Sequence, residues 1–315
     1  MKHLTYTLTI IIGITFLCQP MHAQKTGKKY RIDRYSSLYL PLGKISFADS
    51  LVSFKMGNPA PLKQFQDSTQ CLHEPNYKNY QTPNFTSIGC KGSITVAFTD
   101  NGFMNLKGRD IYIFEVGPSR EAATVEISEN NEDWISVGTI TGGKSYIDLD
   151  DFDIDTETVF YYLRITDIAT LCRSKTAGAD IDAIAAINSV IKLNINADVL
   201  FDIADYKVKE SALETLTELS NTIKQVDKAT ILIEGHTDSD GDTAYNQKLS
   251  ENRCLSVKDR IQAILGYDAL YDYEIKAYGE SKPRVENTSR ANKKLNRRVE
   301  ITVLPPKDYF EGILD

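Results

Sequence analysis

Residues 231–265 join a short apolar run to a long helical pattern, and this stretch limits the possible folds of the chain more than any other. The run at 231–233 is typical of a buried strand that ends in a turn. A helix is expected to begin after Asp242 or Thr243, because either side-chain oxygen can accept from backbone N–H groups left unpaired in a first helical turn. A buried strand followed by a long helix predicts an α/β unit.

The predicted helix carries an apolar face and a polar stripe beside it. Asn246, Ser250 and Arg253 lie four and three residues apart, on one stripe of the helix surface. Asp238 lies in the preceding loop, and Arg253 follows it by fifteen positions (253 − 238 = 15), about three turns into the helix. Their side chains are therefore expected to converge over one groove. The apolar positions that are expected to pack against the sheet are Tyr245, Leu249, Leu255, Ile261, Ile264 and Leu265.

A carboxylate and a guanidinium that converge over one groove form a pair of binding groups for one small zwitterion. Asp238 would accept from an ammonium group, and the guanidinium fork of Arg253 would donate two parallel hydrogen bonds to a carboxylate. The alternative is a structural ion pair between loop and helix, which contributes little when it is exposed. Such binding breaks no bond, so it needs no nucleophile.

Several short motifs occur in one order in the last third of the chain. They are ADVLFD at 197–202, TD at 237–238, Gly241, YN at 245–246, LS at 249–250, Arg253, GES at 279–281 with Pro283, and NRRVEI at 296–301. Together they resemble the OmpA-like peptidoglycan-binding domain. This resemblance implies an α/β fold for residues 190–305, with a mixed sheet and helices on one side, and a C-terminal tail at 306–315.

The resemblance also implies a ligand and roles for single residues. In that family, an Asp and an Arg at the positions of Asp238 and Arg253 hold the amino and carboxylate groups at one end of diaminopimelate, in the peptide stem of peptidoglycan. Thr237 and Asn246 are expected to help, because each can donate to a carboxylate or orient it. The other interpretation of these two side chains is that they are turn and cap residues.

Residues from two further segments are expected at the same groove. Phe201 and Asp202 follow the first strand of the domain and would form one wall, with strand-end packing as the alternative. Arg297 and Arg298 lie in the last strand pattern on opposite faces, so only one of them can face the groove. Arg297 is the predicted one.

The first 23 residues have the pattern of a secretory signal peptide. They contain one charged side chain, Lys2, and an apolar core too short for a helix that spans a membrane. We expect cleavage after Ala23 and export of the mature protein, and the bulky residues before Cys18 argue against lipidation. Together with the resemblance, this predicts a periplasmic protein associated with the outer membrane and the cell wall.

Residues 24–189 are predicted to form an all-β sandwich, because short apolar runs are separated by turn residues. The runs lie at 93–98, 110–116, 124–128, 134–140, 145–149 and 159–166. Their order resembles discoidin-like or galactose-binding-like jelly-roll modules, which often bind glycans, and Trp134 is expected to anchor the core. An eight-stranded membrane barrel is the rival architecture, but most runs are shorter than the ~9 to 11 residues of barrel strands.

Four of the five cysteines remain after removal of the signal peptide, and exported proteins can keep disulfides. Cys71 with Cys90 is the predicted disulfide, and Cys90 with Cys172 is the rival pairing. Cys254 is next to Arg253 on the helix and is expected to be a buried free thiol.

The cysteine and histidine spacings match no zinc site, so the prediction is that the protein has no cofactor. Calcium is the alternative, with Asp180 and Asp182 as candidate ligands, because segments rich in Asp supply the oxygen ligands that this cation needs. The formal net charge of −7 disfavours nucleic acid and anionic lipid as partners.

These observations predict a non-catalytic envelope protein that binds peptidoglycan through diaminopimelate and tethers an N-terminal sandwich to the cell wall. The sandwich would contact an outer-membrane partner or a surface glycan. A secreted glycan-binding adhesin or a glycan hydrolase accessory protein is the alternative. A hydrolase needs paired carboxylates or a nucleophile beside a histidine, and the chain after residue 23 keeps only His73 and His236.

Overall fold

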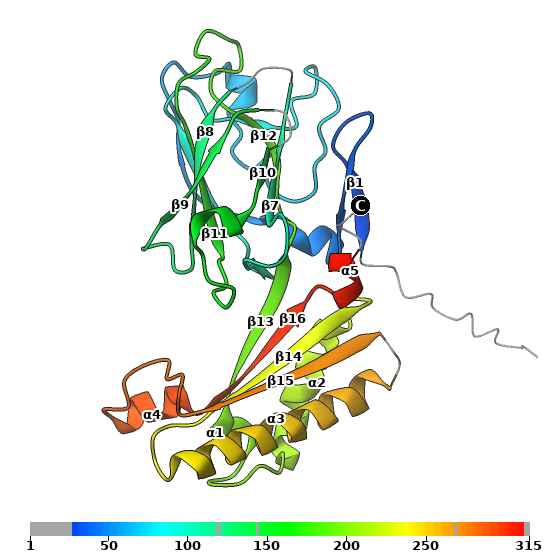
Figure 1. Ribbon diagram of the computed structural model, residues 1–315. Helices are drawn as coiled ribbons and strands as arrows, with labels where there is room; N and C mark the ends of the chain where they lie inside the picture. Colours follow the sequence, from blue (N-terminus) through cyan, green and yellow to red (C-terminus); the bar gives the residue numbers. More distant parts are fainter. Residues whose placement is uncertain (1–26, 118–120, 143–144, 268–269, 312–315) are drawn as a thin grey trace, which may run out of the picture.

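A computed structural model of the protein describes residues 27–117, 121–142, 145–267 and 270–311 (Figure 1). The predicted signal peptide at 1–23 lies outside these residues. Figure 1 shows an N-terminal part built of strands and, below it, a C-terminal sheet with helices. Every helix of the described part is too short or too polar to cross a membrane.

The N-terminal part contains two antiparallel sheets around one hydrophobic core. Their strands are β3 (Ser50–Lys55), β4 (Thr86–Ser87), β5 (Ser93–Ala97), β7 (Ile111–Glu115), β8 (Ala123–Ser128), β9 (Ile135–Ile140), β10 (Ser145–Ile147), β11 (Tyr162–Asp167) and β12 (Asp180–Ala186). One sheet has the order β3-β5-β11-β8-β9 and the other the order β10-β7-β12-β4. Ile94 and Val125 from the first sheet meet Ile113 and Ile184 from the second in the core. These two layers agree with the predicted sandwich, whereas its jelly-roll class stays a prediction.

An N-terminal hairpin covers the outer face of the second sheet. It consists of β1 (Lys28–Arg31) and β2 (Ser37–Leu40). The N-terminal part also contains three short 3-10 helices, η1 (Gly43–Ser46), η2 (Lys63–Phe65) and η3 (Leu149–Phe152). Successive side chains of a strand point to opposite faces, so Tyr112 and Phe114 of β7 face away from the sandwich core. They pack with Tyr30 and Leu40 of the hairpin in a second hydrophobic cluster. β7 is therefore apolar on both faces.

Trp134 is not a core residue, which corrects the prediction from the sequence. Its side chain is only partly buried, and the guanidinium of Arg164 lies 3.7 Å from its ring centroid. Arg164 lies between the buried residues Leu163 and Ile165 of β11, so it points to the outer face of the first sheet. Trp134 therefore covers the outside of the sandwich, held by a cation–π contact.

The disulfide joins Cys90 to Cys172, so the predicted bond between Cys71 and Cys90 is wrong and the rival pairing is present. The Cα atoms of the bonded pair are 5.6 Å apart, which is within the range that a disulfide spans. Cys71 lies fully buried in the sandwich core, where its thiol donates to the Ser68 carbonyl oxygen at 3.4 Å. Cys254 is a buried free thiol, as predicted.

The C-terminal part is a mixed sheet with helices packed against one face. Its elements are β13 (Ser189–Asn196), α1 (Ala197–Leu200), η4 (Glu210–Ala212), α2 (Leu213–Ile223), β14 (Ala229–His236), α3 (Thr243–Leu265), β15 (Tyr271–Gly279), α4 (Arg290–Asn296), β16 (Arg298–Leu304) and α5 (Lys307–Glu311). β14 and β15 are parallel, and β16 pairs antiparallel with both β14 and β13. Leu216 of α2 and Val257 of α3 share a core with Ile231 and Ile301 of the sheet, and Figure 1 shows both helices on the same side. This agrees with the predicted α/β fold. The segment 306–315, which was predicted to be a C-terminal tail, contains the short helix α5.

The connection between the two parts is short and buried. Ile187 and Asn188 alone separate β12 from β13, and the short strand β6 (Gly102–Phe103) of the N-terminal part pairs with β13. The carboxylate of Asp110 accepts from Asn188 Nδ2 at 2.6 Å and from the backbone N–H of Leu149 at 2.7 Å. Burial raises the pKa of Asp110 to about 7. These contacts fix the start of β13, from which the C-terminal sheet continues.

Helix α3 buries a more polar face than the sequence predicted. Asp242 is its N-cap residue, and Oδ1 accepts from the backbone N–H groups of Ala244 at 2.9 Å and Tyr245 at 3.2 Å. Tyr245 and Leu255, which were predicted to pack on the sheet, are 50% and 39% exposed. The buried positions are Asn246, Leu249, Ser250, Arg253, Cys254, Val257 and Ile261. The helix therefore turns part of its polar stripe inward.

Peptide mapping without reductant is expected to recover Cys90 linked to Cys172, with Cys71 and Cys254 as alkylated thiols. The bonded cysteines are 82 residues apart, so Cys172→Ala should lower the free energy of unfolding by about 2 to 5 kcal/mol, because the unfolded chain gains conformational freedom. Reductant should lower the melting temperature of the unmodified protein and leave that of the variant unchanged. A recovered peptide that links Cys71 to Cys90 would contradict the structure.

Carboxylates buried in the sandwich make its stability depend on pH. Glu121 is 3% exposed, and its Oε1 has no hydrogen-bond partner in the described part of the chain. Burial, together with the charges of Asp180 and Asp167, raises the pKa of Glu121 from 4.5 to about 9. Between these two values the folded protein keeps a proton that the unfolded chain has released. The contribution of Glu121 to stability is therefore fully present below pH 4.5 and is lost as the pH rises toward 9.

The substitution Glu121→Gln removes this titration while keeping the shape of the side chain. At pH 8 the variant should be more stable than the unmodified protein by about 1 to 3 kcal/mol, because its folding does not require the uptake of a proton by an ionised carboxylate. At pH 5 the two proteins should differ little. Thermal melting at both pH values measures this, and equal stability at pH 8 would show that Glu121 is not the titrating group.

Candidate binding site

A cavity of about 670 Å³ opens where four segments of the C-terminal part meet. These segments are the loop after β14, the first half of α3, the turn after α1 and the loop that leads into α4. Six of the seven residues predicted for the site line this cavity. They are Asp202, Thr237, Asp238, Asn246, Arg253 and Arg297.

The close approach of α3 to β14 positions Arg253. Gly235 lies near the end of β14, and a Cβ atom built on it would lie 2.6 Å from Cys254 Sγ and 2.7 Å from the Ser250 carbonyl oxygen. Any larger residue at 235 would push the helix away from the sheet. Ser250 Oγ also accepts from the backbone N–H of Gly279, at 3.0 Å, which ties α3 to the end of β15. These contacts therefore fix the backbone of α3 at Arg253, whose side chain reaches the edge of the cavity.

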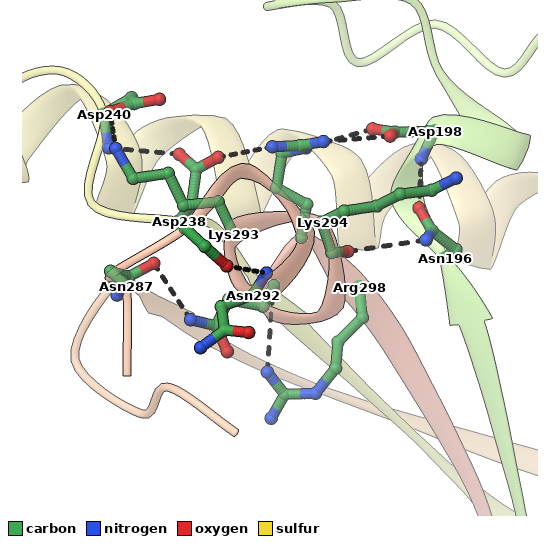
Figure 2. A network of polar contacts seen from close by, with 12 residues as sticks. Asn196, Asp198, Asp238, Asp240, Asn287, Asn292, Lys293, Lys294 and Arg298 are labelled. Atoms are coloured by element: carbon green, nitrogen blue, oxygen red, sulfur yellow. Dashed lines mark hydrogen bonds and ion pairs between the residues drawn. The ribbon is translucent and has the colours of Figure 1, made fainter. Parts of the chain in front are cut away.

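Asp238 is held by Arg297, and Arg297 is in turn held by Asp198. Arg297 Nη1 donates to Asp238 Oδ2 at 2.6 Å, while Nε and Nη2 donate to the two oxygens of Asp198 at 3.0 and 2.9 Å. Asp238 Oδ1 accepts from the backbone N–H of Asp240 at 3.1 Å. Figure 2 shows the carboxylates of Asp198 and Asp238 on two sides of this network of polar contacts. The bidentate contact lowers the pKa of Asp198 and raises that of Arg297.

Arg253 is buried but keeps donors free. Its side chain is 5% exposed, Nε donates to the Asp205 carbonyl oxygen at 2.9 Å, and the guanidinium lies 5.0 Å from the ring centroid of Phe201. Burial lowers its pKa from the ordinary value. Within the described ranges, neither Nη atom has a hydrogen-bond acceptor, and no carboxylate pairs with Arg253. The ion pair between Asp238 and Arg253 that the sequence left open is absent, because Asp238 pairs with Arg297.

Thr237 and Asn246 have different surroundings. Thr237 is 3% exposed, and its Oγ1 has no partner among the described residues. Asn246 Nδ2 donates to Glu280 Oε2 at 2.6 Å and lies 3.3 and 3.2 Å from the carbonyl oxygens of Asp238 and Asp240. Asn246 therefore holds the loop in shape, as the cap interpretation predicted, whereas Thr237 offers an unused hydroxyl to the cavity.

Phe201 is buried, whereas the next residue, Asp202, is exposed. Phe201 is 2% exposed and lies outside the cavity lining, in the hydrophobic core beneath Arg253, so strand-end packing describes it better than a cavity wall. The Asp202 carboxylate is largely exposed at the rim, 3.7 Å from Lys209 Nζ. Arg297 faces the cavity, and Arg298 faces away from it, where its Nε donates to Glu300 at 2.6 Å.

The two histidines lack the surroundings of a catalytic base. His236 is 3% exposed, stacks on Tyr278 with ring centroids 5.2 Å apart, and has no hydrogen-bond partner for either ring nitrogen among the described residues. Burial lowers its pKa to about 4. His73 is exposed in a loop of the N-terminal part, with a φ of 66°. Neither ring is placed to activate a nucleophile at the cavity.

Asp180 and Asp182, the candidate calcium ligands, are buried in the N-terminal part. Asp180 accepts from the Ser87 hydroxyl, and Asp182 accepts from the backbone N–H groups of Asn76 and Tyr77 at 3.0 and 3.1 Å. Burial raises the pKa of Asp180 to about 7 and that of Asp182 to about 6. The described part of the chain contains no cluster of three or more acidic, cysteine or histidine side chains that could hold a metal ion. The two carboxylates have structural partners instead.

Reasoning from the sequence missed several residues of the site. Asp198 pairs with Arg297, and Lys293 Nζ pairs with Asp240 at 2.5 Å, which raises the pKa of Lys293 (Figure 2). Asp198 belongs to the ADVLFD motif, so the motif marked the right segment but not the right side chain. Lys293 lies in a run of basic residues, and no spacing distinguishes it from its neighbours there.

A comparison with protein families matches residues 200–297 to the OmpA family. The chain is 35% identical over 141 residues to outer membrane porin F of Pseudomonas aeruginosa, a match that covers 44% of this chain and 39% of that protein. It is 37% identical over 112 residues to the outer-membrane lipoprotein YfiB of the same species, covering 36% of this chain and 66% of that one. The chain thus spans well under two thirds of the porin.

Part of the chain is also similar to solved structures. The cell wall anchor of the T6SS from Pseudomonas aeruginosa matches with a TM-score of 0.33 and 29% identity, over 38% of this chain and 85% of that chain. The peptidoglycan-associated lipoprotein from Burkholderia pseudomallei matches with a TM-score of 0.30 and 27% identity, over 33% of this chain and 87% of that chain.

Proposed function

We propose, from the premise that residues 200–297 form an OmpA-family domain, that this domain holds the zwitterionic end of diaminopimelate in the peptide stem of peptidoglycan. The protein is then a non-catalytic protein of the cell envelope. Its C-terminal domain binds the cell wall, and its N-terminal sandwich is tethered there through the short connection at Ile187 and Asn188.

The main support for this proposal is a set of hydrogen-bond donors at the cavity that have no acceptor in the described structure. Arg253 is 5% exposed and has two Nη atoms without an acceptor in the described structure, and Thr237 Oγ1 is buried without a partner. Buried polar groups are nearly always paired, and an unpaired hydroxyl such as that of Thr237 costs about 1 to 3 kcal/mol. A ligand carboxylate can use all of these donors, because each of its oxygens can accept from one Nη atom and one oxygen can also accept from the Thr237 hydroxyl.

Asp238 supplies the complementary charge. One lone pair on each of its oxygens is used by Asp240 and Arg297, and a carboxylate can accept about four hydrogen bonds in all. An ammonium group of the ligand can therefore donate to Asp238 without displacing Arg297. One amino-acid headgroup then spans the two residues, with its ammonium at Asp238 and its carboxylate at Arg253. Thr237 donates to the same carboxylate.

The relatives support an envelope location. Their names place them in the outer membrane, and one is a lipoprotein of that membrane. We place this protein in the periplasm, exported by the expected signal peptide at 1–23 and associated with the outer membrane and the cell wall. The sandwich extends from the wall-bound domain, where it contacts an outer-membrane partner or a surface glycan.

Retention on purified cell-wall sacculi tests the proposed function. Asp238→Asn removes the charge that pairs with the ligand ammonium, and Arg253→Ala removes the fork that pairs with its carboxylate. Each substitution should reduce the retained fraction by at least about tenfold, the loss expected for one charge-assisted hydrogen-bonded contact. A sedimentation assay of the full chain with sacculi measures this.

Glu251→Gln serves as the control in this assay. Glu251 lies on α3, two residues before Arg253, but it forms an exposed ion pair with Lys248 outside the cavity. This variant should be retained like the unmodified protein, and thermal melting of all three variants should show that they are folded. Full retention of both folded site variants would rule out the proposed site.

A lysine with blocked α groups, Nα-acetyl-lysine amide, separates the two halves of the proposed contact without any mutation. Its only charged group is the side-chain ammonium, which lacks the adjacent carboxylate of diaminopimelate, so it leaves Arg253 unpaired when it binds Asp238. Titration calorimetry should therefore give a dissociation constant for this compound at least about tenfold weaker than for diaminopimelate. Equal affinity for both compounds would show that Arg253 does not bind the ligand.

A further inference from the structure

Two apolar side chains stand exposed at one side of the same cavity. Ile203 is 99% exposed, and Tyr245 is 50% exposed, and both line the cavity that contains Asp238 and Arg253. Ile203 has the largest exposed fraction among the large hydrophobic side chains of the described chain. A single exposed apolar side chain needs no explanation, but two that border a polar ligand cavity form a surface for an apolar group.

The two residues lie in segments that a hydrogen bond joins. Ile203 lies in the segment between α1 and η4, and the hydroxyl of Tyr245 donates to the carbonyl oxygen of the next residue, Ala204, at 3.3 Å. Tyr245 itself is fixed by the N-cap of α3, where its backbone N–H donates to Asp242. The apolar surface, Ile203 with the ring of Tyr245, thus borders the cavity from two segments that the hydrogen bond from Tyr245 to Ala204 joins.

The cavity has room for more than one headgroup. Its volume of about 670 Å³ lies within the range of pockets that enclose drug-sized ligands, about 300 to 1,000 Å³. The ammonium and carboxylate that pair with Asp238 and Arg253 are only one end of an amino acid, so the remaining space borders the next residue of the bound peptide.

We infer, on the basis of the proposed function, that Ile203 and Tyr245 form a subsite for a small apolar side chain next to the bound diaminopimelate, namely the methyl group of alanine in the peptide stem. The exposed carboxylate of Asp202 lies directly before Ile203 at the same rim. A stem residue with a carboxylate side chain would meet this charge, whereas a methyl group would meet the isoleucine. The subsite therefore selects a neutral, small residue.

The experiment compares two dipeptides that differ in one methyl group. In diaminopimelyl-D-alanine and diaminopimelyl-glycine, the second residue is joined to the same carboxyl group, and the distal amino-acid end is free for Asp238 and Arg253. The unmodified full chain should bind the alanine dipeptide about fourfold more tightly than the glycine dipeptide, the factor that burial of one methyl group gives. In Ile203→Ser this ratio should fall to about one.

Val199→Ser is the matched control. Val199 is an aliphatic residue of α1 that is 45% exposed, but it does not line the cavity. This variant should keep the fourfold ratio. Because Ile203 is almost fully exposed, its replacement is not expected to disturb folding, and thermal melting checks this.

The possible results separate the inference from the proposed function. If free diaminopimelate gives no heat with the unmodified protein, the proposed function fails, and the subsite fails with it. If free diaminopimelate binds but the two dipeptides bind equally, or if Ile203→Ser keeps the ratio of the unmodified protein, only the subsite is overturned. A ratio that is lost in Ile203→Ser and kept in Val199→Ser supports the subsite.

Discussion

One guanidinium, that of Arg297, organises the candidate site. It joins Asp198 and Asp238, which lie 99 and 59 residues earlier in the chain, at distances between 2.6 and 3.0 Å. An isolated buried charge costs several kcal/mol, and pairing with Arg297 removes much of this cost for Asp238. In the described structure, Arg297 and not Arg253 is the ion-pair partner of Asp238. The two Nη atoms of Arg253 therefore remain available to a ligand.

The sequence alone predicted the parts of the fold that depend on local periodicity. The strand, loop and helix between residues 229 and 265 follow from an apolar run, a capping aspartate and a helical repeat, and these features act within a few residues. The spacing of Asp238 and Arg253 likewise placed both at one cavity, because the helix fixes how far each turn advances. The alternation of side chains along a strand predicted that only one of Arg297 and Arg298 faces the groove, but not which one, and the structure places Arg297 at the cavity.

The remaining features depend on contacts between distant segments, and no local pattern contains them. The partner of Cys90 is set by how the strands of the sandwich pair, so the sequence alone could not decide between Cys71 and Cys172, and Cys172 is bonded. The buried face of α3 is set by the close approach at Gly235, which turns Ser250 and Cys254 inward and leaves Tyr245 exposed. The resemblance to jelly-roll modules led to the prediction that Trp134 is in the core, whereas in the structure its ring packs against the Arg164 guanidinium on the outer face of a sheet.

A crystal structure of the full chain with bound diaminopimelate tests the central claim most directly. The account predicts one carboxylate of the ligand within about 3 Å of both Nη atoms of Arg253, and the adjacent ammonium at a similar distance from Asp238, with the contact between Arg297 and Asp198 unchanged. A ligand bound elsewhere, or one whose ammonium and carboxylate do not contact these two side chains, would contradict it.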